Sequence, residues 1–143
     1  MSKNKPWTDV LIDTKDFTVY KDKYPVTEGH ILFVPKEQTW QDLSKCFEAA
    51  YKWGYDWVDR GYCEAFNIGQ NCGEAAGQTI DWPHVHLIPR RKGDMKDPTG
   101  GVRHVIPEKG NYKTNEIYKK INGNYTTQEV VDATNKILEG DLC

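Results

Sequence analysis

The chain has 143 residues, a formal net charge of −2 and 38% hydrophobic residues. This length suits a domain with its own core, and the composition excludes a disordered chain. The charge shows no basic excess of the kind that nucleic-acid-binding domains carry, so we expect no nucleic-acid partner. The polar start of the chain, the absence of a long apolar stretch and four cysteines without paired spacing predict a cytoplasmic protein with reduced thiols and no membrane partner.

The first half of the chain predicts three strands and a long helix. Apolar residues recur at three- and four-residue steps from Trp40 to Val58, which indicates a helix that begins after Thr39 and ends near Arg60. Thr39 and Asp42 form a weak version of a capping box. Gly54 lowers helix propensity in mid-helix, so we expect another element to approach closely there. The strands precede the helix and are expected at Val10–Asp13, Phe17–Lys21 and Ile31–Pro35.

The second half predicts two more strands and one helix. A strand over Glu64–Gly69 leads into a glycine-containing loop over residues 70–79. Such a loop can direct several backbone N–H groups at an anion, although it also suits an ordinary hairpin connection. Residues 97–107 show little periodicity and indicate an ordered loop. The last helix is expected to begin at Thr126, with Glu129 completing a capping box and Tyr125 in a hydrophobic staple, and to end at Gly140.

Two histidines two residues apart carry the chemistry. On a strand, His84 and His86 point to one face, with Trp82, while Val85 and Leu87 point into a core. Two neighbouring imidazoles can act as nucleophile and proton donor, or as metal ligands. They are also compatible with two unrelated histidines on a solvated strand. A metal site would add a thiolate from Cys63 or Cys72, but their spacing does not resemble a structural zinc site.

Two helices and about five mostly antiparallel strands give an α+β domain, although the strand order does not follow from the sequence. The stretch Gly77-Gln78-Thr79, followed by His84 and His86 and an apolar run, closely resembles the signature of the histidine triad (HIT) superfamily. Trp82 stands where that signature has its first histidine. Further segments over residues 8–112 resemble members that hydrolyse dinucleoside polyphosphates.

The resemblance implies a fold and an assembly. The fold is a five-stranded antiparallel sheet with two main helices and a C-terminal helical extension. We therefore expect a nucleotide-binding domain over residues 1–112 and an extension over residues 113–143 that packs on the same domain. The resemblance also implies a homodimer whose two sheets join into one.

The resemblance also implies roles for individual residues. His84 is expected to attack the α-phosphorus and form a nucleotidyl-histidine, and His86 is expected to contact the phosphate. A charged His86 and loop N–H groups would neutralise phosphate charge. His30 and His104 are expected to be structural. The remaining site residues are expected to contact the phosphate, the leaving group, the sugar or another part of the nucleotide. These residues are Asp22, Asn71, Gly77, Gln78, Thr79 and Trp82.

These roles imply a nucleotide hydrolase that cleaves dinucleoside polyphosphates or adenylylated compounds at the α-phosphate. No metal or cofactor is expected on the protein itself, although Mg²⁺ can arrive with a polyphosphate. Two alternatives stay open because of Trp82. The protein could bind nucleotides with weak or no turnover. It could also be a nucleotidyltransferase, because Trp82-Pro83-His84-Val85-His86 resembles the Pro-His-x-His of that branch.

Overall fold

The computed structural model describes residues 4–114 and 127–140 of the chain. They belong to two compact units, Met1–Asp97 and Pro98–Cys143, and each is described by itself. This division falls after Asp97, and the expected boundary of the nucleotide-binding domain at residue 112 stays a prediction. The packing of residues 113–143 on the first unit stays a prediction. In the described part of the chain, no helix is long and apolar enough to cross a membrane.

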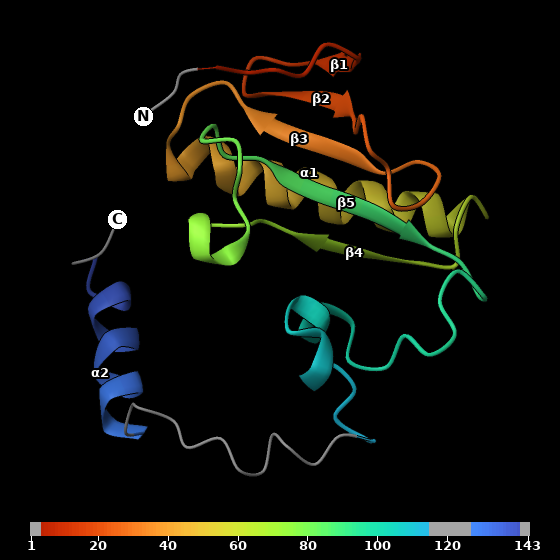
Figure 1. The fold of residues 1–143 in the computed structure, drawn as a ribbon. Coiled ribbons are helices and arrows are strands. Elements are labelled where there is room, and N and C mark those ends of the chain that lie inside the picture. The colour runs from red at the N-terminus through yellow and green to blue at the C-terminus, as the bar shows by residue number, and fades with distance from the viewer. Residues whose placement is uncertain (1–3, 115–126, 141–143) are drawn as a thin grey trace. The chain divides into compact units, whose positions relative to one another are not determined.

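The first unit is a five-stranded sheet in which every neighbouring pair is antiparallel (Figure 1). The order is β1-β2-β3-β5-β4, so the histidine-bearing strand β5 lies between β3 and β4. Register places His86 opposite Leu32 of β3 and Gly69 of β4. The predicted α+β class, antiparallel sheet and two helices are confirmed. The strands are β1 (Val10–Asp13), β2 (Phe17–Lys21), β3 (Ile31–Pro35), β4 (Ala65–Gly69) and β5 (Val85–Arg90).

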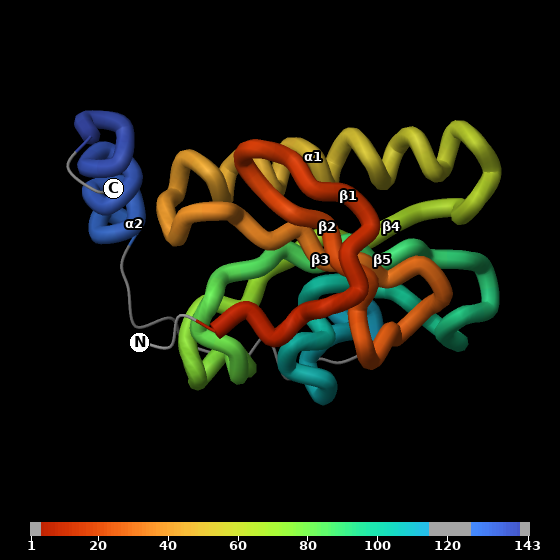
Figure 2. Tube along the Cα trace, turned by 90° about the horizontal axis from the view of Figure 1, so that it is seen from above, coloured from red at the N-terminus to blue at the C-terminus, as the bar shows by residue number. Residues whose placement is uncertain are grey.

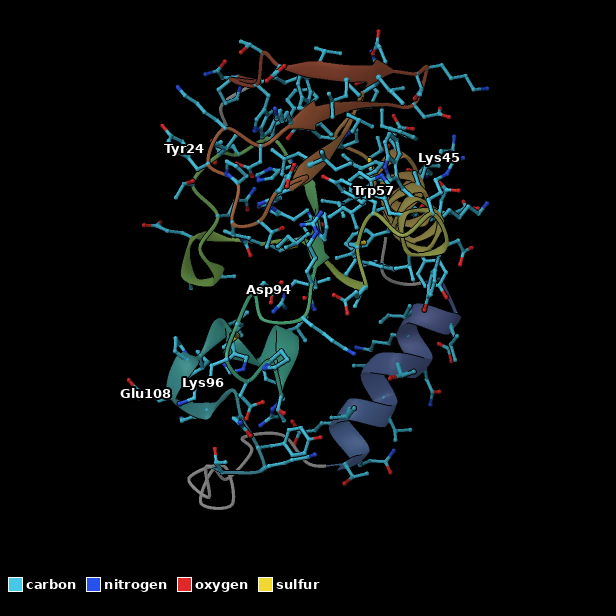
Figure 3. All side chains as sticks on the ribbon, turned by 90° about the vertical axis from the view of Figure 1, so that its right-hand side faces the viewer. Tyr24, Lys45, Trp57, Asp94, Lys96 and Glu108 are labelled. Atoms are coloured by element: carbon cyan, nitrogen blue, oxygen red, sulfur yellow. The ribbon has the colours of Figure 1, made fainter. Side chains whose placement is uncertain are left out.

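The helix α1 (Trp40–Asp59) covers one face of the sheet, and the start of the chain lies on the other face (Figure 2). Figure 3 shows Lys45 and Trp57 on α1 and Tyr24 on the opposite side of the sheet. Side chains alternate along the strands, so each face has its own hydrophobic cluster. The cluster under α1 contains Val19, Ile31, Phe33, Cys46, Ala50, Val85 and Leu87. The cluster on the other face contains Tyr20, Leu32, Val34 and Trp82.

Helix α1 begins and packs as its sequence predicts, with one difference at the cap. The Thr39 hydroxyl accepts a hydrogen bond from the Asp42 backbone N–H at 3.2 Å. The Asp42 carboxylate accepts from the N–H of Glu37 instead of Thr39, so the capping box is incomplete. A Cβ atom placed on Gly54 would lie 2.6 Å from the ring of Phe66. The expected close approach at Gly54 is therefore made by β4.

The second unit contains two short 3₁₀ helices, Gly101–Val105 and Pro107–Lys109, and the helix α2 (Thr127–Leu138). The predicted loop over residues 97–107 is therefore partly helical. The helix ends as predicted, because Gly140 has a φ of 80° and donates its N–H to the carbonyl of Ile137. The predicted cap Thr126 and staple residue Tyr125 lie outside the described residues.

Candidate functional site

A pocket of about 650 Å³ lies on the face of the sheet that α1 does not cover. Both histidines of the β5 stretch open into it, as their alternation with the buried Val85 and Leu87 predicts. The Gly77-Gln78-Thr79 segment forms another part of its wall. The full lining comprises residues 6–9, residues 21–24, Leu32, Asn71, residues 77–80, His84 and His86.

The tautomer of His84 is fixed by a backbone carbonyl. Its Nδ1 lies 2.9 Å from the carbonyl oxygen of Trp82, which can only accept a hydrogen bond. Nδ1 therefore carries the proton and donates it to that oxygen. The lone pair is left on Nε2, which is the form an attacking imidazole needs.

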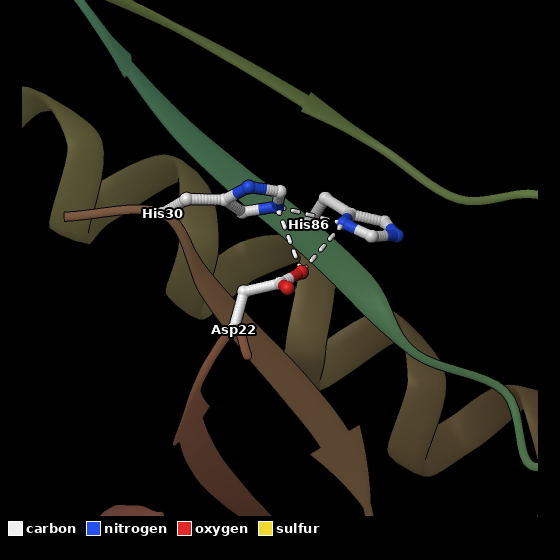
Figure 4. Close-up of side chains that lie close together, drawn as sticks. All are labelled: Asp22, His30 and His86. Atoms are coloured by element: carbon white, nitrogen blue, oxygen red, sulfur yellow. Dashed lines mark hydrogen bonds and ion pairs between the residues drawn. The ribbon is translucent and has the colours of Figure 1, made fainter. Parts of the chain in front are cut away.

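A second network joins His86 to His30, which directly precedes β3, and to Asp22, which directly follows β2 (Figure 4). His30 Nδ1 accepts a hydrogen bond from the N–H of Val26 at 3.2 Å, so the His30 proton is on Nε2. His30 Nε2 lies 2.9 Å from His86 Nδ1 and 3.3 Å from Asp22 Oδ2. His86 Nδ1 therefore accepts, and its own proton is on Nε2. In Figure 4 that nitrogen points away from His30 and Asp22.

Burial keeps this network neutral. Burial lowers the pKa of His86 to about 4, with further lowering from the nearby imidazoles of His84 and His30, against an opposing effect of Asp22. Burial also lowers the pKa of His30, again opposed by Asp22. The protonated Nε2 of His30 faces Asp22 Oδ2 at 3.3 Å, whereas the unprotonated Nδ1 of His86 lies 3.9 Å from the same oxygen and has no proton to donate to it. Neither contact is therefore a full ion pair at neutral pH. The expected charged His86 is corrected to a neutral N–H donor, because the buried site disfavours the imidazolium ion.

The Asp22 carboxylate is more engaged than its expected role as a sugar ligand implies. Its Oδ1 accepts from the N–H of Tyr24 at 2.7 Å, and its Oδ2 faces His30. Each carboxylate oxygen has further acceptor capacity, and Asp22 lines the pocket. A sugar hydroxyl therefore remains compatible with the site.

The Gln78 side chain holds the loop before β5 in place. The amide of Gln78 accepts from Gly73 N–H at 2.8 Å and donates to the carbonyls of Ile80 and Asp81. The Gln78 amide therefore holds the loop, and because Gln78 also lines the pocket, its expected contact with phosphate stays a prediction.

The other expected loop residues remain open to a ligand. Asn71 and Thr79 line the pocket, and within the described chain their side chains have no hydrogen-bond partner. Gly77, with a φ of 93°, allows the chain to turn between the 3₁₀ helix Glu74–Ala76 and Gln78.

Trp82 does not face the pocket. Its side chain is 8% exposed, packs in the cluster with Leu32 and Val34, and donates its indole N–H to the carbonyl of Pro35 at 2.9 Å. The expected contact of Trp82 with the nucleotide is therefore corrected. Its indole anchors the start of β5 to the end of β3, and its carbonyl holds His84.

Among the residues described, the ligand atoms of Asp22, His30 and His86 lie close enough together to hold a metal ion. This set contains neither His84 nor a cysteine, so it differs from the metal alternative considered from the sequence. Ligation by His30 Nε2 would require the proton on Nδ1, where it would face the Val26 N–H. The donor set therefore suits a hydrogen-bond network better than a metal.

Sequence reasoning missed two parts of the site. His30, expected to be structural, is 4% exposed and contacts His86 directly. The segment Gly29-His30 lies in a stretch that resembles HIT superfamily members, and this resemblance was the feature of the sequence that could have indicated a role for His30 in the site. The N-terminal residues 6–9 also line the pocket, and nothing in their pattern marked them.

Comparison with known proteins decides the family. The HIT domain model matches residues 3–93, which include every residue that lines the pocket. The chain belongs to the HIT family. The HIT domain thus coincides with the first compact unit and ends near its boundary at Asp97.

Two curated HIT relatives act on nucleotides. The chain is 31% identical over 98 residues to the asymmetrical bis(5'-nucleosyl)-tetraphosphatase of Schizosaccharomyces pombe, covering 63% of this chain and 53% of that protein. It is 31% identical over 94 residues to an adenosine 5'-monophosphoramidase of Saccharomyces cerevisiae, covering 57% of this chain and 53% of that protein. The chain thus spans about half the length of these relatives.

Among solved structures, a HIT family protein from Bacillus anthracis superposes with a TM-score of 0.59 at 24% identity. The match covers 92% of this chain and 86% of that chain. At this level of identity the similarity shows the fold alone. The fold of this chain is the HIT-like α+β architecture.

Proposed function

We propose that this HIT protein is a nucleotide hydrolase that cleaves its substrate at the α-phosphate through a nucleotidyl-His84 intermediate. The observation that carries this proposal is the hydrogen bond from His84 Nδ1 to the Trp82 carbonyl, because it leaves the Nε2 lone pair available as a nucleophile. Two relatives with names of nucleotide hydrolases support the class of reaction.

The chemistry follows from the two tautomers. In the first step, His84 Nε2 forms a bond to the α-phosphorus, and the bond from phosphorus to the leaving group breaks with its electron pair. The N–H of His86 Nε2 donates to an oxygen of the reacting phosphate as charge builds up there. In the second step, the oxygen of a water molecule bonds to phosphorus, the bond between phosphorus and His84 Nε2 breaks with its electron pair returning to Nε2, and the water loses a proton to solvent as the nucleoside monophosphate leaves. Any Mg²⁺ would arrive with a polyphosphate substrate.

The test uses diadenosine tetraphosphate and adenosine phosphoramidate with wild-type protein, His84→Asn and the control His104→Asn, whose histidine is not a pocket residue. We expect AMP release and, in rapidly quenched samples, an intact-mass increase of one adenylyl group in the wild type and control only. AMP release by His84→Asn would overturn the proposal. Nucleotide binding without AMP or adduct in the wild type would instead identify a binding protein.

We also propose a homodimer formed through β4. β4 is an edge strand, and Tyr51 and Tyr55 of α1 are about half exposed beside it, in ring contact with Phe66. An open strand edge with exposed aromatic residues favours pairing with a second copy. Light scattering should give twice the chain mass, and Tyr55→Glu should shift it to the monomer; a monomeric wild type would contradict this.

We propose a cytoplasmic location as well. Cys46, Cys63 and Cys72 are free thiols, which suits a reducing compartment. Fractionation of cells that produce the tagged protein would test it, and recovery from an oxidising compartment would contradict it.

A further inference from the structure

The N-terminal strap, residues 4–9, lies against the pocket on the face that carries the histidines. Pro6, Trp7, Thr8 and Asp9 all line the pocket. The strap is tied to the sheet, because the carbonyl of Asp9 accepts the N–H of Lys21 at 2.9 Å, one residue before Asp22. Its position is therefore coupled to β2 and to the site.

Trp7 is the strap residue that touches the nucleophile. Its ring centroid lies 4.9 Å from that of His84 at an interplanar angle of 61°, and 5.8 Å from that of Tyr20. Trp7 also packs against the cluster that contains Trp82. Two groups thus restrict the imidazole of His84. The carbonyl of Trp82 accepts the hydrogen bond from Nδ1, and the indole of Trp7 packs against the ring.

The strap also contacts Trp82. The ammonium group of Lys5 lies 4.2 Å from the ring centroid of Trp82, in a cation–π contact. The strap therefore contacts both the nucleophile and the residue whose carbonyl holds it. Trp82 occupies the place of the first triad histidine, so these contacts surround the point where the chain departs from the HIT signature.

We infer that Trp7 is a positioning residue for His84. An imidazole can rotate about two side-chain torsions, and only some of its orientations keep Nδ1 on the Trp82 carbonyl. The indole of Trp7 occupies space into which the ring would otherwise turn, so Nε2 stays directed at the substrate. This role rests on the proposed function of His84 as nucleophile. Because the rate of a reaction falls steeply when the reacting groups are misplaced, removing the indole should lower kcat roughly 10- to 100-fold.

The test compares Trp7→Ala and Trp7→Phe with the control Trp40→Ala, whose side chain is 59% exposed at the start of α1. The first readout is nitrogen NMR of the His84 ring, assigned by its disappearance in His84→Asn, and it needs no turnover. We expect wild type, Trp7→Phe and Trp40→Ala to show one tautomer with the proton on Nδ1. Trp7→Ala should show averaged tautomers. An unchanged single tautomer in Trp7→Ala would overturn the inference.

Steady-state kinetics form the second readout. Trp7→Ala should lower kcat with little change in KM, and Trp7→Phe should restore most of the rate. A raised KM with unchanged kcat would overturn the positioning role and make Trp7 only a wall for the substrate. If the wild type turns over none of the substrates, the proposed function fails while the NMR result still decides the role of Trp7. If Trp7→Ala fails to fold, Trp7→Leu replaces it in both measurements.

Discussion

At the scale of single residues, the backbone carbonyl of Trp82 holds the proposed nucleophile, His84. It fixes the tautomer of His84, and any residue at this position would supply the same atom. The indole itself is directed into the sheet face and bonds to Pro35. A tryptophan at the position where we expect the first triad histidine therefore still leaves the hydrogen bond on which the proposed nucleophile depends.

This arrangement predicts a small catalytic effect of substitution at Trp82. Trp82→Phe should keep the turnover within a few fold of wild type and lower the free energy of unfolding by about 1 kcal/mol, because the Pro35 carbonyl loses its donor. Trp82→His should not raise kcat. Steady-state assays and urea unfolding measure the two effects, and a tenfold gain in kcat for Trp82→His would contradict the prediction.

The neutral His86 predicts a pH dependence of stability. Its pKa is lowered from 6.5 to about 4, chiefly by burial, so between these values the unfolded chain binds a proton that the native chain does not. The free energy of unfolding contributed by this group is fully present above pH 6.5 and is lost as the pH falls through 4. At 1.4 kcal/mol per pKa unit, with allowance for partial solvent exposure, the loss is about 2 kcal/mol.

Urea unfolding of wild type and His86→Asn between pH 7 and pH 4 measures this contribution. The wild type should lose more stability than the variant over that range. The lowered pKa of His30 acts in the same direction and stays in both proteins. Equal slopes in the two proteins would contradict the prediction.

The local pattern around His84 and His86 sufficed to predict that both histidines face the pocket while Val85 and Leu87 are buried, because strand alternation is a property of neighbouring residues; it did not predict that Trp82 is buried away from the pocket. It did not predict the partner of His86. His30 lies 56 residues away in the sequence, and only the pairing of β3 with β5 brings it within 2.9 Å. The burial that removes the charge from His86 is likewise a property of the folded site.

At the scale of elements, the sequence pattern predicted β2, β3, β4 and the bounds of α1 closely, whereas β5 begins only after His84 and the strand order did not follow from the pattern. β5 enters the sheet between β3 and β4, which is decided by long-range packing under α1. Pro89 is a case in which the sequence did anticipate the pairing. Pro83 and Pro89 predict a strand with limited ladder partners on one side, and Pro89 lies beyond Leu87, the last residue of β5 that pairs with β3.

The contact between α1 and β4 predicts an unusual response to alanine at Gly54. Alanine usually stabilises a helix by about 1 kcal/mol relative to glycine. Here the added methyl group would meet the ring of Phe66 at 2.6 Å, and overpacking of this kind costs about 1–3 kcal/mol. Gly54→Ala should therefore lower the free energy of unfolding.

Chemical unfolding of Gly54→Ala alone and combined with Phe66→Leu tests this. The smaller side chain should recover part of the loss in a double-mutant cycle. A stabilising Gly54→Ala substitution would show that the ring moves aside at no cost.

At the scale of the whole molecule, the pocket and both hydrophobic clusters lie within Met1–Asp97. A chain ending at Asp97 should therefore unfold cooperatively and bind nucleotide with an affinity close to that of the full chain. Calorimetry and nucleotide titration of both proteins measure this. A fragment without a cooperative transition would show that residues 98–143 complete the fold.

The buried His30–His86 pair has one more consequence, for the thermodynamics of ligand capture. An anionic phosphate next to His86 would raise the pKa of its imidazole above the value of about 4, so binding should draw a proton from solution at pH values between the pKa of the free site and that of the occupied site. Affinity for phosphate compounds would then rise as the solution becomes more acidic, and the heat of binding would depend on the ionisation enthalpy of the buffer. The same burial that weakens the fold in acid would in this way make the site a proton-coupled anion receptor.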